Sequence, residues 1–257
     1  MPTTLPFRVV IPARYASTRL PAKALLPIAG KPMVQHVFER AKLSNAEEVL
    51  IATDDPRIQA VAEGFGARVV MTDPAHRSGT DRIAEVAVRE AWANETVVVN
   101  VQGDEPLIPP ALINQVASLL NAHAEADIAT LCTAIHSLDE VFDLSVVKVV
   151  FNCRSEALYF SRAPIPWQRD AFVADPKFLP EGAVFYRHIG LYAYRVGYLA
   201  SYAQLAPVAA EQAESLEQLR ALMNGYKILV QEAHSVPGPG VDTLEDLQRV
   251  RQHLGLG

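Results

Sequence analysis

The sequence predicts an α/β protein with a mostly parallel, Rossmann-like sheet and helices on both of its faces. One observation is a set of short apolar runs, such as Phe7–Pro12 and Thr96–Gln102, with little polar alternation, which is typical of strands buried on both faces. The other is that each such run in the first half precedes a segment with helical spacing, so strand and helix alternate four times. Ligands of such sheets bind beyond the carboxyl ends of the strands.

The first half of the chain contains these four strand–helix pairs. Met33, Val37 and Phe38 fall on one face of the first helix, which opens on a proline. The second helix reaches a glycine stop at residue 64 or 66. The expected strands cover 7–12, 47–53, 67–71 and 96–102, and the expected helices cover 32–43, 56–66, 80–93 and 109–123.

The second half has a different pattern, in which strands are separated by short turns. Residues 153–156 are typical of a hairpin connection, and a capping pattern opens the last helix. The segment 168–182 is mixed in character and bounded by proline, so we expect a mobile loop there. The expected strands cover 127–135, 146–152, 157–163, 183–195 and 226–233, and the expected helices cover 216–225 and 241–254.

The bulk composition limits the classes of function. The 257 residues carry a net charge of −6 with a pI near 5.7, so binding of nucleic acid through a general basic surface is not expected. Cys132 and Cys153 are too few and too far apart for a disulfide framework or a zinc site, and we expect reduced thiols in a cytoplasmic protein. We recognise no signal peptide and no apolar run near the roughly 18 residues of a membrane helix, so no membrane partner is expected.

A loop with fixed positive charge follows the first strand. It carries Arg14, Arg19 and Lys23, includes Pro12 and Pro21, and contains no glycine. The chain lacks the P-loop and G-x-G-x-x-G fingerprints, so a triphosphate here would be held by side-chain cations on a rigid loop instead of by glycine amides. A solvated basic loop explains the same residues equally well.

Two aspartates are candidates for a magnesium site. Asp104 follows an apolar strand within the motif VQGDEP, at the edge where a ligand would bind. Asp242 precedes the last helix after PGPG. Magnesium typically takes one or two protein carboxylates. Asp104 could equally be a turn residue, and Asp242 a helix N-cap.

Further polar residues stand at helix starts and on the later strands. Small polar residues in HRSGTDR precede a helix N-terminus, where backbone amides attract anions or base edges, although a simple cap with Arg82 on the surface fits as well. Arg162, beside an aromatic-rich strand, could clamp a small carboxylate. For His188 a structural role is the more frequent outcome, and Glu217 is by default solvated or paired with Arg220.

Taken together, these segments resemble one family. In chain order they read IPARYASTRLPAKAL, ATDD, HRSGTDR, NVQGDEPLIP, FSRAPIPW, RHIGLYAYR, LEQLR and PGVDTLEDL. The series is similar to that of the 3-deoxy-manno-octulosonate (Kdo) cytidylyltransferases, from Val9 to about Val250. The motifs around Arg14–Lys23 and Gln102–Pro106 recur in sugar cytidylyltransferases generally, whereas FSRAPIPW and RHIGLYAYR favour the Kdo branch.

The resemblance implies a reaction and a role for each candidate residue. The 2-hydroxyl of the sugar acid attacks the α-phosphorus of CTP, pyrophosphate leaves, and CMP-Kdo is formed for lipopolysaccharide biosynthesis. In the implied catalytic set, Arg14 and Lys23 hold the triphosphate, while Asp104 and Asp242 ligate Mg²⁺. The implied nucleoside contacts are Ser78, Gly79, Thr80 and Arg82, and the implied sugar contacts are Gln102, Arg162, His188, Tyr192 and Glu217, with Arg162 opposite the sugar carboxylate.

The resemblance also implies an organisation of the nucleotide-diphospho-sugar transferase type. The chain 1–257 forms one domain, in which 1–125 mainly binds nucleotide and 126–257, with an inserted β-rich subregion, mainly binds sugar and dimerises. A homodimer is implied, and the aromatic strand region Leu158–Tyr194 could pair across a two-fold axis. Two alternatives stay open: transfer to another 2-keto sugar acid, such as neuraminate or 8-amino-Kdo, and a catalytically silent nucleotide-binding protein.

The chain departs from the family pattern at one place. Similar sequences usually read RLPGKPL, whereas this chain reads RLPAKAL, so Ala22 replaces a glycine and Ala24 a proline. If position 22 requires a positive φ, alanine costs about 1 kcal/mol there. Because Lys23 is retained, we expect the loop geometry to change slightly and the reaction to persist.

Overall fold

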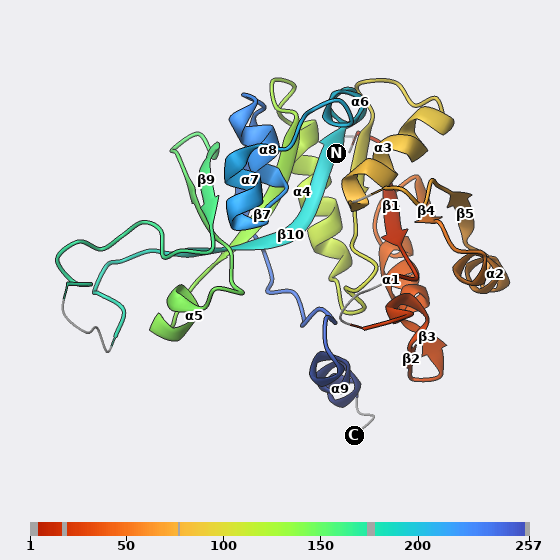
Figure 1. The fold of residues 1–257 in the computed structure, drawn as a ribbon, viewed down its shortest axis with the longest axis horizontal. Helices are drawn as coiled ribbons and strands as arrows, with labels where there is room; N and C mark the ends of the chain where they lie inside the picture. Colours follow the sequence, from red (N-terminus) through yellow and green to blue (C-terminus); the bar gives the residue numbers. More distant parts are fainter. Residues whose placement is uncertain (1–4, 17–19, 77, 174–177, 255–257) are drawn as a thin grey trace.

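The computed structural model of the chain describes residues 5–16, 20–76, 78–173 and 178–254, and at its centre lies one mixed sheet (Figure 1). The strand order along the sheet is β11-β7-β10-β6-β1-β4-β5, with β8 and β9 attached beside β10. Its strands are β1 (Phe7–Ala13), β4 (Glu48–Thr53), β5 (Arg68–Met71), β6 (Val97–Asn100), β7 (Ile128–Ala134), β8 (Lys148–Phe151), β9 (Ala157–Ser161), β10 (Tyr186–Arg195) and β11 (Ile228–Glu232). The mostly parallel α/β fold predicted from the sequence is confirmed.

The direction of the strands brings the ends of the first-half strands to one edge. β1 pairs in parallel with β4 and with β6, and β4 pairs in parallel with β5. In contrast, β10 runs antiparallel to its neighbours β6 and β7, so it passes through the middle of the sheet in the opposite direction. The loops that follow β1, β4 and β6 therefore meet at one edge, as expected of their carboxyl ends.

Helices cover both faces of the sheet, and in this way they bury the apolar side chains on both sides of β1. Val9 and Ile11 face a core shared with α1 (Met33–Lys42), α2 (Pro56–Gly64) and α4 (Pro110–Asn121). Val10 faces the opposite core, which α3 (Gly79–Arg89), α6 (Val196–Tyr202) and α8 (Gln218–Met223) complete. Burial on both faces explains the near-continuous apolar sequence of this strand.

The second half adds an arm that projects from the sheet (Figure 1, left). Strands β8 and β9 form the expected antiparallel hairpin, and α5 (Leu138–Phe142) lies near its base. A small core of Ile135, Val141, Phe172 and Phe185 holds the arm together. The described part of 168–182 contains no helix or strand, in line with the loop expected there.

A further group of elements lies at the lower edge of the molecule as seen in Figure 1. The 3₁₀ turn η1 (Lys23–Leu25), the short pair β2 (Pro27–Ile28) and β3 (Lys31–Pro32), and α9 (Leu244–His253) lie here. Ile28, Met33, Leu247 and Val250 form their shared core. No described helix is both long enough and apolar enough to cross a bilayer.

Two kinds of difference separate the expected elements from the observed ones. Short helices were not expected at α5, α6 or α7 (Ala209–Glu214), which span only five to seven residues each. The helix expected over 80–93 ends at Arg89, because Ala91 adopts a left-handed conformation with φ of 50°. Helical periodicity needs about three turns before it is distinct from other patterns, so helices this short leave little trace in a sequence.

Candidate active site

Two adjoining cavities open at the carboxyl ends of β1 and β6. The first cavity, of about 260 Å³, is lined by the loop after β1, the start of α3, the turn after β6 and Asp242. The second cavity, of about 330 Å³, lies between the end of β6, β10, α6 and the start of α8. Arg14, Ser78, Gly79 and Gln102 line both of them, so the two cavities share a wall.

The loop after β1 is closed on itself beside the first cavity. The Ala22 amide donates to the Tyr15 carbonyl at 3.1 Å, which ties the two ends of the loop together. Ala22 has φ of 55° and ψ of 25°, so this position does adopt the left-handed conformation that favours glycine. Lys23 follows at once as the first residue of η1. Arg19, the third cation of the loop, lies outside the described residues.

Lys23 joins the two candidate magnesium ligands. Its Nζ donates to Asp104 Oδ2 at 2.6 Å and to Asp242 Oδ1 at 3.0 Å. Burial by itself would lower the pKa of Lys23, but the two carboxylates outweigh it and the pKa is raised. The two aspartates therefore share one cation, although they stand far apart in the sequence.

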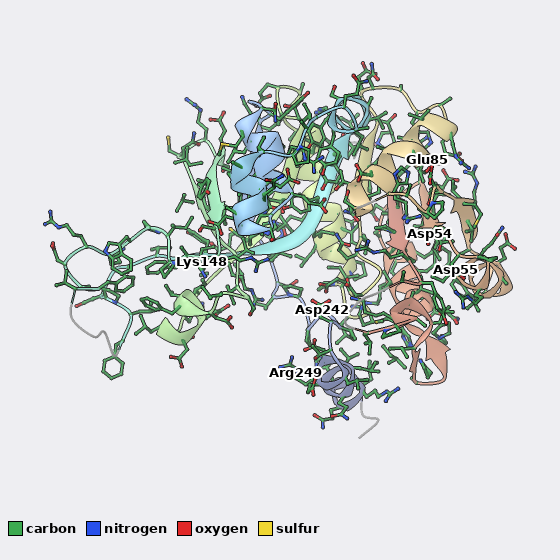
Figure 2. All side chains as sticks on the ribbon, in the orientation of Figure 1. Asp54, Asp55, Glu85, Lys148, Asp242 and Arg249 are labelled. Carbon is green, nitrogen blue, oxygen red and sulfur yellow. The ribbon has the colours of Figure 1, made fainter. Side chains whose placement is uncertain are left out.

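Local backbone contacts bring these two carboxylates together. Gly103 sits so close to β1 that an added Cβ would lie 2.8 Å from the Pro12 carbonyl oxygen, which explains a glycine before Asp104. The Val241 amide donates to the Asp104 carbonyl at 2.9 Å, so the chain preceding α9 is held against the turn after β6. Figure 2 shows Asp242 just before α9. The N-cap of α9 is Thr243, so the alternative interpretation of Asp242 as the cap is wrong.

Glu105 is a third carboxyl group at this place, which the sequence interpretation did not single out. It lines the second cavity, and an added Cβ on Gly240 would lie 2.8 Å from its Oε1. Burial, and next the negative charges of Asp104 and Asp242, raise the pKa of Glu105 to about 8. The VQGDEP motif contains this residue, and only its packing distinguishes it from an ordinary turn glutamate.

The chemistry of the Asp104–Asp242 pair fits a magnesium ion. Both side chains offer hard carboxylate oxygens, and both already converge on a single cation. No group of three or more His, Cys, Asp or Glu ligands occurs in the described part of the chain. A pair is sufficient, because magnesium usually keeps several waters and takes its other ligands from substrate phosphates.

The start of α3 forms the wall common to both cavities. Ser78 caps the helix and completes a capping box with Asp81, so the capping alternative is correct for its side chain. Gly79 packs against β1, where an added Cβ would lie 3.3 Å from Pro12 Cγ. Thr80 donates to Glu217 Oε2 at 3.2 Å across the second cavity. This contact also corrects the alternative of an Arg220-paired Glu217, since Arg220 pairs with Glu211.

Arg82 is buried and does not lie on the surface. Only 2 % of this residue is exposed, and its Nη2 donates to Asp54 Oδ2 at 2.9 Å. Asp54 directly follows β4, so the pair links two loops of the carboxyl edge, as the strand order predicts. Arg82 also lines the first cavity. Arg77, in the same HRSGTDR motif, is outside the described residues.

Four of the five predicted sugar contacts line the second cavity, namely Gln102, His188, Tyr192 and Glu217. His188 Nε2 and Thr130 Oγ1 are 2.9 Å apart, and burial lowers the pKa of His188 to about 3. Burial raises the pKa of Glu217. The cavity thus presents a neutral imidazole beside polar and aromatic groups, which suits a polar, uncharged portion of a ligand.

Arg162 is the fifth predicted sugar contact, and it does not line either cavity. Its Nε donates to the Glu214 carbonyl at 2.8 Å and its Nη1 to the Leu144 carbonyl at 2.9 Å. These bonds anchor the base of the arm to α7. Its role toward a sugar carboxylate stays a prediction.

The fold and the cleft define a nucleotide-binding α/β protein of the transferase type, with its polar site at the carboxyl edge of the sheet. A family model described as cytidylyltransferase matches residues 8–228. The 3-deoxy-manno-octulosonate cytidylyltransferase of Marinobacter nauticus is 57 % identical over 255 residues, which cover 98 % of each chain. That of Thioalkalivibrio sulfidiphilus is 56 % identical and covers 96 % of this chain and 98 % of its own. The chain therefore belongs to the 3-deoxy-manno-octulosonate cytidylyltransferase family.

Solved structures agree with this placement. A structure of CMP:2-keto-3-deoxy-manno-octonic acid synthetase complexed with CTP superimposes with a TM-score of 0.89 at 45 % identity, over 98 % of this chain and 99 % of that one. A cytidylyltransferase from Leptospira borgpetersenii, at 18 % identity and a TM-score of 0.61, shares the fold. The family predicted from the sequence motifs is confirmed.

Proposed function

We propose that this protein transfers the cytidylyl group of CTP to 3-deoxy-D-manno-octulosonate, for lipopolysaccharide biosynthesis. A bond forms between the sugar 2-oxygen and the α-phosphorus, the bond from that phosphorus to the pyrophosphate oxygen breaks, and the 2-hydroxyl loses its proton. Family membership supports the substrates. The observation that carries the proposal is the meeting of Asp104 and Asp242 at one cation, beside a second cavity of suitable size.

The two cavities divide the substrates between them in this proposal. Arg14 and Lys23 bind the triphosphate in the first cavity. Ser78, Gly79 and Arg82 of the same cavity, together with Thr80 on the wall of the second, lie toward the nucleoside. Gln102, His188, Tyr192 and Glu217 surround the sugar acid in the second. Magnesium held by Asp104 and Asp242 would neutralise phosphate charge, which is the main need of phosphoryl transfer. Lys23 then exchanges its carboxylate partners for phosphate oxygens.

Replacement of Asp104 tests this assignment. Asp104→Asn keeps the shape of the side chain and removes its charge, so we expect turnover to fall at least about 100-fold while the fold is retained. Pyrophosphate release from CTP and Kdo measures turnover, and circular dichroism measures the fold. Asp170→Asn is a matched control, because Asp170 is 83 % exposed and contacts Arg169 alone among described ion pairs. Full activity of Asp104→Asn would remove this residue from the metal site.

The wild-type protein distinguishes the alternative substrates. Pyrophosphate release should be fastest with Kdo, and slower with 8-amino-Kdo or neuraminate under the same conditions. A preference for one of the other acids would reassign the substrate and leave the reaction unchanged. Binding of CTP in calorimetry without turnover of any acid would support the silent nucleotide-binding alternative instead.

We also propose that the protein is a cytoplasmic homodimer that associates through the arm. Large apolar side chains are exposed on it, including Leu158, Trp167, Val173 and Phe178 at 56–82 %. Both cysteines are free thiols, which fits a reducing compartment. Light scattering should give twice the mass of one chain, and Phe178→Asp should shift it toward monomer. A wild-type monomer at micromolar concentration would refute the dimer.

A further inference from the structure

The second cavity contains two buried polar atoms without a hydrogen-bond partner. Among the described residues, the only such side-chain atoms are Asn100 Oδ1 and the Tyr202 hydroxyl. Asn100 is 2 % exposed and Tyr202 is 1 % exposed, and both line the second cavity. Buried polar groups are nearly always satisfied, so two orphans in one cavity point to a ligand that supplies the partners.

The Tyr202 ring is held rigidly, so its hydroxyl cannot turn away to find another partner. Arg220 lies 4.6 Å above the ring, and Arg220 is itself fixed by an ion pair with Glu211 at 2.5 Å. The ring also packs 5.8 Å from Tyr198, and Tyr198 stacks on Tyr194 at the same distance. A row of tyrosines thus runs along one wall of the cavity.

The hydroxyl hydrogen of Ser78, a polar neighbour of Tyr202, is committed elsewhere. Ser78 is near enough to offset part of the raised pKa of Tyr202, a rise that burial dominates. However, Ser78 Oγ donates to Asp81 Oδ2 at 2.9 Å and accepts from the Asp81 amide at 3.1 Å, as the capping box requires. The capping role of Ser78 therefore leaves it no hydrogen to donate to the tyrosine oxygen.

Asn100, the residue of the second unpartnered atom, is the last residue of β6. Its Cα is in register with that of Tyr192 on β10, and its amide partly offsets the burial-raised pKa of Tyr194. Its Oδ1 has no such contact and can only accept a hydrogen bond. The missing partner must be a donor.

We propose that the Tyr202 hydroxyl and Asn100 Oδ1 bind hydroxyl groups of the sugar acid and discriminate for the hydroxylated chain. An alcohol group can donate to Asn100 and can accept from, or donate to, Tyr202, so one class of ligand satisfies both atoms. A site built to bind a hydroxyl rejects an analogue that lacks it, because its own polar atoms stay unpaired. This inference rests on the proposed function, which supplies the sugar acid.

Tyr202→Phe separates this role from a purely structural one, because the two effects have opposite signs. Removal of an unsatisfied buried hydroxyl should raise the melting temperature of the ligand-free protein by about 2–4 °C. Loss of the contact to substrate should raise KM for Kdo about tenfold, with KM for CTP unchanged. Tyr226→Phe is the matched control, because Tyr226 packs 4.9 Å from Tyr198 and does not line the cavity.

Substrate analogues and a second variant complete the test. Wild type should discriminate about tenfold or more against at least one 2-keto sugar acid that lacks a single hydroxyl, and Tyr202→Phe or Asn100→Ala should abolish that discrimination. An unchanged Kdo KM in both variants, or a rise in the CTP KM alone, would overturn the inference. If wild type fails to convert Kdo at all, the proposed function fails instead, so the two failures are distinguishable.

Discussion

Ala22→Gly is the perturbation whose effect the structure defines most directly. Ala22 adopts φ of 55° and ψ of 25°, and two backbone bonds hold it there, from its amide to Tyr15 and from the Leu25 amide to its carbonyl at 2.8 Å. A left-handed conformation costs an L-residue about 1–2 kcal/mol, whereas glycine loses roughly 0.5–1 kcal/mol more chain entropy than alanine on folding. The difference predicts that Ala22→Gly stabilises the protein by about 0.5–1 kcal/mol.

Thermal and urea unfolding measure this change against two matched substitutions. A gain of this size raises the melting temperature by about 1–4 °C in a chain of this length. Ala91→Gly should give a similar gain, because Ala91 has φ of 50° and lies away from both cavities. Ala203→Gly should lose about 0.5 kcal/mol, because Ala203 has right-handed helical angles.

The loop itself should keep its shape in Ala22→Gly, because glycine accepts the same angles. KM for CTP should therefore change less than about threefold, which is under 0.7 kcal/mol. The reasoning would be refuted if Ala22→Gly were no more stable than wild type while Ala91→Gly was stabilised. That result would mean that strain at position 22 is relieved in some other way.

Three further predictions concern the charged groups. In the absence of CTP, Lys23→Met should bind Mn²⁺ about tenfold more tightly than wild type, because the ammonium no longer occupies the oxygens of Asp104 and Asp242. Weaker binding would contradict a shared site. Lys31→Met is the control, because Lys31 pairs with Glu39 instead. Lys148→Met should lower the free energy of unfolding in urea by about 2–4 kcal/mol, because the buried ammonium donates to the carbonyls of Asp143, Val146 and Arg162. Lys227→Met, which removes an ion pair with Glu156, should lower it by less than about 1 kcal/mol. Equal losses in the two variants would refute this prediction. Burial would raise the pKa of Asp246, but bonds from Arg249 and from the amides of Asp242 and Thr243 lower it to about 2. Its stabilising effect is complete above its ordinary value near 3.8 and is lost as pH falls toward 2, so the stability deficit of Asp246→Asn should shrink over that interval; a constant deficit would contradict it.

The predictable part of the fold consists of elements whose signal is local. β1, β4 and β6 are recognisable in the sequence as short apolar runs, because both faces of each strand are buried. The longer helices α1, α3 and α4 repeat their apolar residues often enough to be recognised. In contrast, α6 spans seven residues and carries no distinct period, so the sequence did not indicate that Tyr198 and Tyr202 line a cavity.

The candidate site was predictable in residue type, and its arrangement was less so. The motifs identified Arg14, Lys23, Asp104 and Asp242, and the structure places all of them on the first cavity. Glu105 and Asn100 lie in the same motif region, yet a sequence does not indicate how deeply each side chain is buried. The surroundings of Arg162 were equally hidden, because its neighbours Leu144 and Glu214 belong to segments that sequence alone cannot bring together.

By itself, the sequence determined the alternation of strands and helices, the family and the positions that carry charge, since periodicity and motifs are properties of neighbouring residues. Only the tertiary structure decided that Lys23 reaches Asp242 across 219 positions, and that β10 enters the sheet in reverse to build the second cavity. Such contacts depend on the packing of whole elements. Their energies come from burial and geometry, which no local pattern encodes.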